Sequence, residues 1–396
     1  MATTQTYDIS PGAIATAGTP GGPPFALSKA EWLTIQTYVV DALALPINDD
    51  EFRKSLGPGA PADLSDFTQL IACYQSINGN GKTWDSATFP NTVALADSVY
   101  DYGANKAPVY YPAILKEANI LVDDPNNEQA KTALKAILGV LEAAASDYAG
   151  KASTAATEVE QFATATQADK VTLLGPNGDA GLVKYYNDEY GAKSAEVEEL
   201  VKNINAQKLI LAAANAEYTH DVTVAATTPT YAWVLPPVGL IAAAIVAGVY
   251  GHKAVEALDE AHAAQDKIDS LEAKQQADAN IMTAITTASA GMTTIVAALS
   301  AALPVIQKIQ GVWAAMAADL AAIATLIETD IEKVPPIIMS LGVDEAVRAW
   351  FNVAQAANAY RVNAYVHETG GPAASMLAWK VGKHIASTPA PLALVA

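Results

Sequence analysis

The chain has 396 residues, a formal net charge of −19 and 51% hydrophobic residues, of which few are aromatic. The negative charge repels nucleic-acid phosphates and anionic membrane surfaces, which argues against both as electrostatic partners. Cys73 has no second cysteine to pair with, so an internal disulfide is excluded and we expect a small buried apolar residue there. Abundant alanine, the strongest helix former, favours an all-α fold of closely packed long helices.

Residues 1–25 are rich in Gly, Pro, Thr and Ala, a composition that predicts a flexible or loosely draped N-terminal segment. The segment lacks a basic region followed by an apolar region, so it is not a recognisable secretory signal. If the protein acts outside its cell, we expect it to leave by another route.

Two shorter helices are predicted next. Ser28 and Glu31 form a capping box that begins a helix ending before Pro46. Residues 63–77 predict a second helix with an apolar face of Phe67, Leu70, Ile71 and Tyr74. The NGNGK sequence at residues 78–82 predicts a turn. Lys82 lacks the glycine spacing of a phosphate-binding loop, so we expect no nucleotide site.

Residues 92–122 predict one helix interrupted near Pro108 and Pro112. A helix of some 45 residues, about 65 Å long, is then expected, with Asn126 or Asn127 as its N-cap. Its coiled-coil-like seam consists of Ala130, Leu134, Ile137, Leu141, Ala145, Tyr148, Ala152, Ala155, Val159 and Phe162. Residues 173–181 lack the ligand ladder of a calcium loop, so an ordinary turn is expected there.

Residues 222–251 contain no charged side chain, and about 20 apolar residues suffice to span a bilayer as a helix. Two consecutive prolines disfavour one straight helix, so we expect a bent hairpin with its tip at residues 236–239. The residues predicted to enter a membrane are Tyr231, Trp233, Val234, Leu235, Pro236, Pro237, Val238, Leu240, Ile241, Ile245, Val246, Val249 and Tyr250.

A buried core hairpin is the alternative interpretation of this apolar segment. Amphipathic patterns at residues 196–218 and 255–331 flank it, and both predict long solvated helices. A connector between such helices has few neighbours that could bury it, which favours membrane insertion.

Residues 255–331 continue the helical pattern after the apolar segment. His252, Glu256, Asp259 and His262 lie three and four residues apart, but without a second cluster they read as a solvated helix face rather than a metal site. Pro304 is expected to kink the helix, and Pro335 with Pro336 to end it. The seam of this helix consists of Met292, Ile295, Leu299, Leu303, Ile306, Ile309, Trp313, Met316, Leu320, Ile323, Ile327 and Ile331.

Residues 343–366 predict the last substantial helix, with Val347, Trp350, Phe351, Ala354 and Ala357 facing inward. No nucleophile-and-base motif, metal-ligand motif or dinucleotide fingerprint occurs in the chain. We therefore expect no enzymatic activity, no cofactor and no metal.

Residues 32–46, WLTIQTYVVDALALP, carry an Ile-Gln-x-Tyr-Val helix that runs into an Ala-Leu-Pro stop. With long helices around an apolar connector, this stretch resembles α-helical pore-forming toxins related to cytolysin A, most closely the A subunit of the two-component α-xenorhabdolysin family. The resemblance implies an elongated all-α bundle, the tail, joined by a neck to a small head that carries a hydrophobic insertion hairpin. It divides the chain into five parts. These are the N-terminal segment (1–25), the first part of the tail (26–205), the neck and head (206–270), the second part of the tail (271–368) and the C-terminal tail (369–396).

The resemblance further implies a soluble cytotoxin that meets a target-cell membrane and assembles into an oligomeric ring, usually with a second subunit. Haemolytic or insecticidal activity belongs to this class of protein. Two alternatives stay open at this stage. The chain could be a non-catalytic helical scaffold whose apolar segment docks on another protein, or a protein anchored in the membrane of its own cell.

Overall fold

The computed structural model describes residues 7–14, 27, 29–190, 276–282 and 292–364, together with the helical positions 199, 202, 203, 206, 263 and 267. Every regular element in these ranges is helical, which confirms the all-α prediction. The chain divides into two compact units. Unit 1 comprises Met1–Ser28, Asp85–Ala163 and Ala297–Ala364, and unit 2 comprises Lys29–Trp84, Thr164–Val296 and Tyr365–Ala396.

Two helices are far longer than the roughly 11-residue average. Helix α6 (Glu128–Leu174) has 47 residues, about 70 Å at 1.5 Å per residue. Its N-cap is Asn127, whose side-chain oxygen accepts a 3.0 Å hydrogen bond from the backbone N–H of Ala130. Helix α11 (Met292–Thr329) has 38 residues and continues through Pro304. The α6 seam, and the second seam as far as Ile327, therefore lie on continuous helices as their periodicity predicts, whereas Ile331 lies in the 3-10 turn η6 (Ile331–Lys333).

The predicted seam of α6 is confirmed with one substitution. Ile137 is only half-buried, and its neighbour Leu138 is 1% exposed instead. The buried face contains both large apolar side chains and several alanines, and neighbouring helices can approach closely at the alanines. The buried positions are Ala130, Leu134, Leu138, Leu141, Ala145, Tyr148, Ala152, Ala155, Ala156, Val159 and Phe162.

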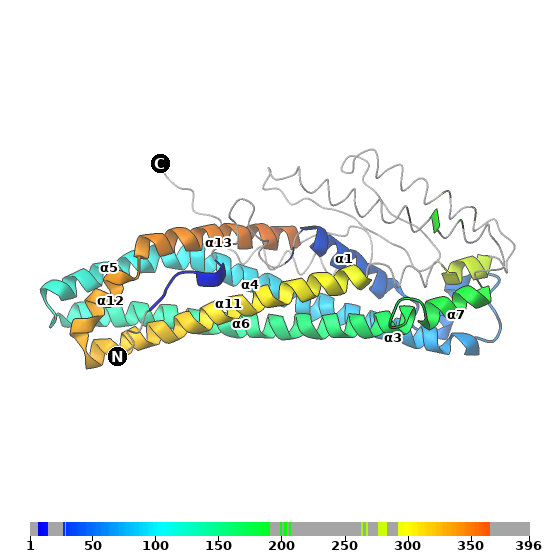
Figure 1. Cartoon of the computed structure of the whole chain (residues 1–396), viewed down its shortest axis with the longest axis horizontal. Helices are drawn as coiled ribbons and strands as arrows, with labels where there is room; N and C mark the ends of the chain where they lie inside the picture. Colours follow the sequence, from blue (N-terminus) through cyan, green and yellow to red (C-terminus); the bar gives the residue numbers. More distant parts are fainter. Residues whose placement is uncertain are drawn as a thin grey trace. The chain divides into compact units, whose positions relative to one another are not determined.

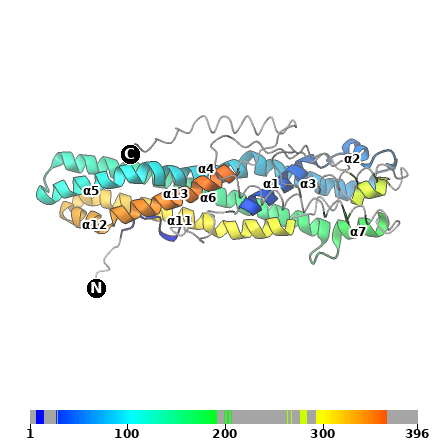
Figure 2. The same ribbon diagram turned by 90° about the horizontal axis from the view of Figure 1, so that it is seen from above.

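Unit 1 gathers α4 (Phe89–Asp101), α5 (Ala107–Asp123), α12 (Val334–Ser340) and α13 (Val343–Ala364) with parts of α6 and α11. Helix α13 lies along α4 and α5, as both views show (Figures 1 and 2). The Arg361 guanidinium, near the end of α13, forms a 2.6 Å ion pair with Asp97 on α4. Asn91 joins α4 to α6 through a 2.8 Å hydrogen bond to Glu158.

Prolines mark two π-helical stretches in an otherwise helical run. Stretch η3 (Trp84–Thr88) precedes Pro90 in the first turn of α4, and η4 (Tyr102–Lys106) precedes Pro108 in the first turn of α5. Proline has no backbone N–H and its ring clashes with the carbonyl four residues back, so a local widening of the helix accommodates it. The predicted interruption near Pro108 is thus a π-helical stretch. The expected break at Pro112 is wrong, because α5 continues through it.

Unit 2 contains α1 (Lys29–Ala44), α2 (Asp49–Leu56), the 3-10 turn η2 (Ser65–Phe67), α3 (Thr68–Thr83), the end of α6 and α7 (Gly181–Tyr190). The predicted inward face of the second helix is confirmed, since Phe67, Leu70, Ile71 and Tyr74 are all buried. Cys73 is buried too, as expected.

The predicted turn at residues 78–82 is wrong, because these residues belong to α3. The Asn78 side chain is buried and donates to the carbonyl oxygens of Ala42 at 3.0 Å and Leu43 at 3.1 Å. An added Cβ on Gly81 would lie 3.1 Å from the Cβ of Ala42, so glycine lets α1 approach closely. Packing against α1 therefore overrides the local turn preference of Asn and Gly.

Two expectations at the end of unit 1 are also corrected. Helix α11 ends at Thr329, and Pro335 and Pro336 lie in the first turn of α12 rather than ending α11. The Phe351 side chain is 49% exposed, whereas its neighbour Trp350 is fully buried. Adjacent residues on a helix point about 100° apart, so both cannot face the same core.

Candidate functional site

The predicted membrane-insertion residues, Tyr231 to Tyr250, lie outside the described residues, as do the neck and the His252–His262 face. Within the described part, Leu299–Thr329 is a helical stretch long and apolar enough to cross a membrane by length and composition. Its inward residues, among them Trp313 and Leu320, form the core of unit 1. Alanines contribute much of the rest of its apolar character. We therefore interpret this stretch as a core helix of the bundle.

Residues 7–14 form an N-terminal strap within the core of unit 1. Ile9 is fully buried and Ile14 is 5% exposed. The Ile9 carbonyl accepts hydrogen bonds from the Tyr111 hydroxyl at 2.5 Å and the Trp350 indole at 2.7 Å. The Asp8 backbone N–H donates to the Asp319 carboxylate at 2.9 Å. For these residues the expectation of a loosely draped segment is wrong, because three helices hold them.

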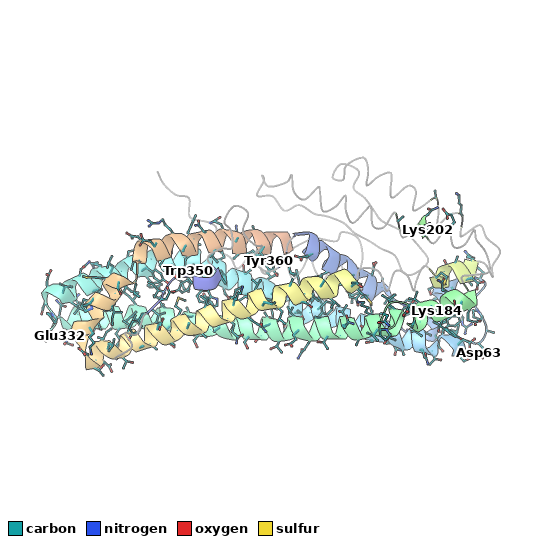
Figure 3. All side chains as sticks on the ribbon, in the orientation of Figure 1. Asp63, Lys184, Lys202, Glu332, Trp350 and Tyr360 are labelled. Atoms are coloured by element: carbon teal, nitrogen blue, oxygen red, sulfur yellow. The ribbon has the colours of Figure 1, made fainter. Side chains whose placement is uncertain are left out.

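Aromatic rings cluster around Trp350 of α13, the residue labelled in Figure 3, whose indole donates to the strap. Trp350 stacks on Trp313 with 4.8 Å between ring centroids, and Tyr102 contacts both rings at 4.8 Å. Tyr148 meets Trp313 edge-on at 5.2 Å. These side chains come from η4, α6, α11 and α13, so the cluster joins four elements of unit 1. Aromatic pairs of this geometry contribute about 0.5–1.5 kcal/mol each beyond their burial.

Gly103 allows this cluster to form. A Cβ added at Gly103 would lie 2.3 Å from the Trp350 carbonyl oxygen and 2.9 Å from the Ala354 side chain. No other residue type fits at such an approach without moving α13. The π-helical stretch η4 thus places its glycine where the α13 backbone at Trp350 approaches closely.

Unit 2 contains a buried polar cluster centred on Asp169 of α6. The Asp169 carboxylate accepts 2.7 Å hydrogen bonds from the Ser76 hydroxyl and the Asn80 amide, both on α3. The side chain is 4% exposed, and burial raises the pKa of the carboxyl above its usual value. No salt bridge to Asp169 occurs within the described residues, so the two hydrogen bonds are what offset its desolvation.

The described residues hold no arrangement suited to catalysis or metal binding. No group of three His, Cys, Asp or Glu side chains in the described ranges could hold a metal ion. Lys82 lies inside α3 rather than in a phosphate-binding loop. Burial raises the pKa of the Cys73 thiol to about 12, so the thiolate needed for nucleophilic reactivity does not form near neutral pH.

Sequence reasoning missed the strap and the polar cluster. Ile9 and Ile14 were a signal for the strap, since they are isolated apolar residues in a Gly- and Pro-rich segment. Thr166 and Asp169 were a signal for the cluster. They continue the spacing of the α6 seam between Phe162 and Leu173, where polar residues imply hydrogen-bond partners on the facing helix.

Comparison with known proteins identifies toxins with the same architecture. No family model matches the chain. It is 27% identical to the pesticidal crystal protein Cry6Ba of Bacillus thuringiensis over 366 residues, covering 86% of this chain and 89% of that protein. The HblL1 toxin component of Bacillus cereus superposes with a TM-score of 0.50 and 16% identity, covering 92% of this chain and 100% of that chain.

Soluble SmhA, of the tripartite α-pore-forming toxin Smh from Serratia marcescens, superposes with a TM-score of 0.51 and 12% identity. The match covers 92% of this chain and 98% of SmhA. Cry6Ba is a pesticidal protein by name, and HblL1 and SmhA belong to toxins by name, in agreement with the prediction of a protein without enzymatic activity. The chain therefore has the all-α long-helix bundle fold of the HblL1 and SmhA toxin components.

Proposed function

We propose that this protein is a component of an α-helical pore-forming toxin and inserts residues 222–251 into a target membrane. The observation that carries the proposal is the fold shared with SmhA, a component of a tripartite α-pore-forming toxin, over 92% of the chain. An uncharged segment of bilayer-spanning length supports it. The similarity to the pesticidal protein Cry6Ba supports an insecticidal target.

In this proposal the soluble form is elongated, with a tail bundle, a neck and a head that covers the apolar hairpin until a membrane is met. The residues that enter the bilayer are those predicted from sequence between Tyr231 and Tyr250. A second subunit completes the oligomeric pore, and the chain takes the part of the A subunit in a two-component system of the α-xenorhabdolysin kind. The protein reaches its target as a soluble molecule.

Transfer of the apolar segment to lipid supplies a large driving force. If half of about 2,000 Å² of apolar surface leaves water, the gain is roughly 25 kcal/mol before ordering costs. Even a fraction of that gain offsets the unpacking of a small helical head. The net charge of −19 keeps a protein with such a segment in solution.

A dye-leakage assay with neutral phosphatidylcholine vesicles tests the proposal, with and without a candidate partner subunit. Ile241→Asp and Ile245→Asp are expected to abolish leakage, because an aspartate at the bilayer centre costs about 3 kcal/mol in every subunit of a ring. Gln307→Asp is the matched control, since Gln307 lies exposed on α11.

The result against the proposal is leakage at the wild-type rate by folded Ile241→Asp and Ile245→Asp proteins. The segment would then not be what enters the bilayer. If instead both variants fail to fold while Gln307→Asp folds, the segment is a core hairpin and the protein is a helical scaffold. Circular dichroism and urea unfolding of each variant distinguish the two results.

A further inference from the structure

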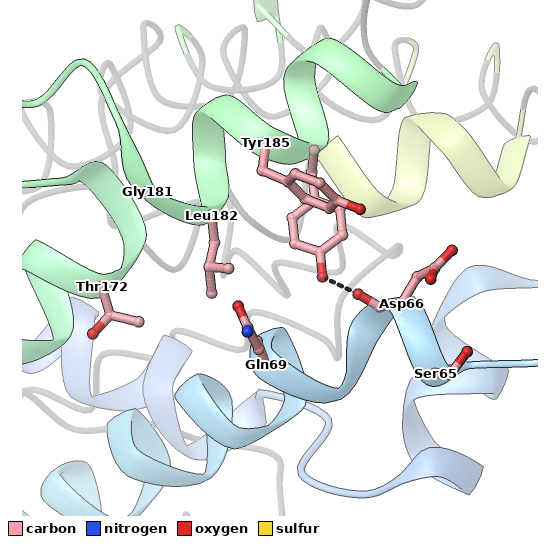
Figure 4. Close-up of a pocket in the computed structure, with 8 residues that line it drawn as sticks. Ser65, Asp66, Gln69, Thr172, Gly181, Leu182 and Tyr185 are labelled. Carbon is pink, nitrogen blue, oxygen red and sulfur yellow. Dashed lines mark hydrogen bonds between the residues drawn. The ribbon is translucent and has the colours of Figure 1, made fainter.

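A pocket of about 510 Å³ opens on unit 2 between the start of α3 and the start of α7 (Figure 4). This volume lies within the range of pockets that take small ligands. The residues that carry the argument below are Asp66, Gln69, Thr172, Leu182, Tyr185 and Tyr186. None of them belongs to the predicted insertion segment or to the core clusters of unit 1.

The turn between α6 and α7 fixes one wall of the pocket. Gly175 and Gly181 both adopt positive φ, of +78° and +80°. A Cβ on Gly181 would lie 2.8 Å from the carbonyl oxygens of Leu173 and Thr172. Since only glycine fits at such an approach, the turn is tightly closed and α7 starts at a defined place beside the end of α6.

Tyr186 fixes the opposite wall. Its ring stacks on Phe67 with 5.4 Å between centroids and 8° between planes. Its hydroxyl donates a 2.7 Å hydrogen bond to the Asp66 carbonyl oxygen, drawn as a dashed line in Figure 4. The pocket is therefore pre-formed, which lowers the ordering cost of binding a ligand.

Tyr185 does not share the buried packing that holds Tyr186. Tyr186 is 1% exposed, whereas Tyr185 is 48% exposed and meets Tyr186 edge-to-face at 5.0 Å. Its ring lines the pocket, and an exposed aromatic ring beside polar groups is typical of a contact surface rather than of a core.

The polar lining is mostly uncharged. The Asp66 carboxylate and the Gln69 amide make no hydrogen bond or ion pair with the described residues, so both can bind a ligand. The Thr172 hydroxyl donates to the Ala168 carbonyl, which leaves its oxygen as an acceptor. Among the described residues that line the pocket there is no Lys, Arg or His, so these residues supply no counter-charge for phosphate, sulfate or carboxylate ligands.

We propose that this pocket binds a neutral sugar residue of a glycan on the target surface. A pyranose has an apolar C–H face that packs on a tyrosine ring and a rim of hydroxyls that pair with carboxylate, amide and hydroxyl groups. An ammonium ligand would use Asp66 but leave Gln69 and Thr172 without a role. A role of this pocket in recognising a target rests on the proposed toxin function, whereas the binding of the sugar itself does not.

The test is binding of the full-length protein to an array of immobilised neutral glycans with terminal glucose, galactose, mannose or N-acetylglucosamine. We expect retention by at least one of them and a loss of about tenfold in affinity for Tyr185→Ala. Tyr185→Phe keeps the ring and is expected to bind like wild type. Phe351→Ala is the matched control, because Phe351 is equally exposed, at 49%, but lies in unit 1.

The inference is overturned if no neutral glycan retains the protein, or if Tyr185→Ala binds as well as wild type. Retention only by choline-bearing vesicles, with loss in Tyr185→Ala, would overturn it too and assign the pocket to an ammonium headgroup. Leakage from glycan-free vesicles is measured in parallel. Leakage without glycan binding defeats only this inference, and glycan binding without any leakage defeats only the proposed toxin function.

Discussion

The indole N–H of Trp350 donates a 2.7 Å hydrogen bond to the backbone carbonyl of Ile9, 341 residues earlier in the chain. The Tyr111 hydroxyl donates to the same oxygen. A single backbone acceptor thus serves two buried aromatic donors, and the Tyr111 hydroxyl also lies 3.0 Å from the Tyr102 hydroxyl. The N-terminal strap is therefore a structural element of unit 1.

Deletion of residues 1–14 is expected to destabilise unit 1 by roughly 3–6 kcal/mol or more, because two buried isoleucine side chains are lost at about 1.5–3 kcal/mol each. Loss of the Ile9 carbonyl, which accepts from Trp350 and Tyr111, adds a further cost. Urea unfolding followed by tryptophan fluorescence measures the change. Ile9→Ala keeps the carbonyl and should cost less, about 2–3 kcal/mol. An unchanged urea midpoint for the deletion would show that the strap contributes nothing.

Gly103→Ala is expected to destabilise unit 1 by about 3 kcal/mol or more, because the new methyl group overlaps the Trp350 carbonyl oxygen. Gly139→Ala on α6 is the control, since nothing lies within 4 Å of its added Cβ. There alanine should stabilise the helix by about 0.5–1 kcal/mol. Thermal melting of the two variants should therefore shift in opposite directions, and equal shifts would contradict the close approach.

Asp169→Asn is expected to remove a pH dependence of stability. The folded pKa of Asp169 is raised above the unfolded value near 3.9, so the folded state binds the proton more tightly. The stabilising contribution is then fully present below about pH 4 and is lost as the pH rises through the folded pKa. Asparagine stays neutral throughout, can donate to the Ser76 oxygen and can accept from Asn80.

Melting temperatures at pH 4, 5, 6 and 7 test this prediction. The wild type should lose more stability than Asp169→Asn as the pH increases. Parallel profiles for wild type and Asp169→Asn would show that the Asp169 carboxylate is not desolvated in solution.

Adding Mg-ATP or a chelator is expected to change neither the melting temperature nor membrane leakage. Lys82 lies within α3, where no run of backbone N–H groups is free to hold a phosphate. The His252–His262 face lacks a second ligand cluster in the sequence. Differential scanning fluorimetry measures this, and a reproducible shift of several degrees on adding Zn²⁺, Ca²⁺ or ATP would reveal a site missed here.

The long helices were predictable because their apolar residues recur with the helical period over many turns, as the α6 seam shows. Local rules failed where distant packing decides the structure. Asn78 and Gly81 favour a turn by themselves, yet α1 supplies hydrogen-bond partners and a close contact that keep them helical. Phe351 was placed inward because an isolated pattern cannot tell which of two adjacent aromatic residues meets the core.

The candidate sites also differ in how far the sequence predicts them. The insertion segment was predictable from composition alone, and its role stays a prediction. The strap, the Asp169 cluster and the pocket beside Tyr185 depend on residues far apart in the sequence, such as Asp66 and Tyr186. Sequence periodicity carries no information about which of these side chains meet.

The hydrogen bond between Ile9 and Trp350 joins residues that are synthesised at different times during translation. Ile9 leaves the ribosome 341 residues before its partner Trp350. At a translation rate of about 5–20 residues per second, roughly 20–70 seconds pass between the synthesis of the strap and that of Trp350 in α13. Unit 1 can therefore close only after α13 has been translated, and nascent chains that end before α13 expose the aromatic side chains of unit 1 that the strap later covers.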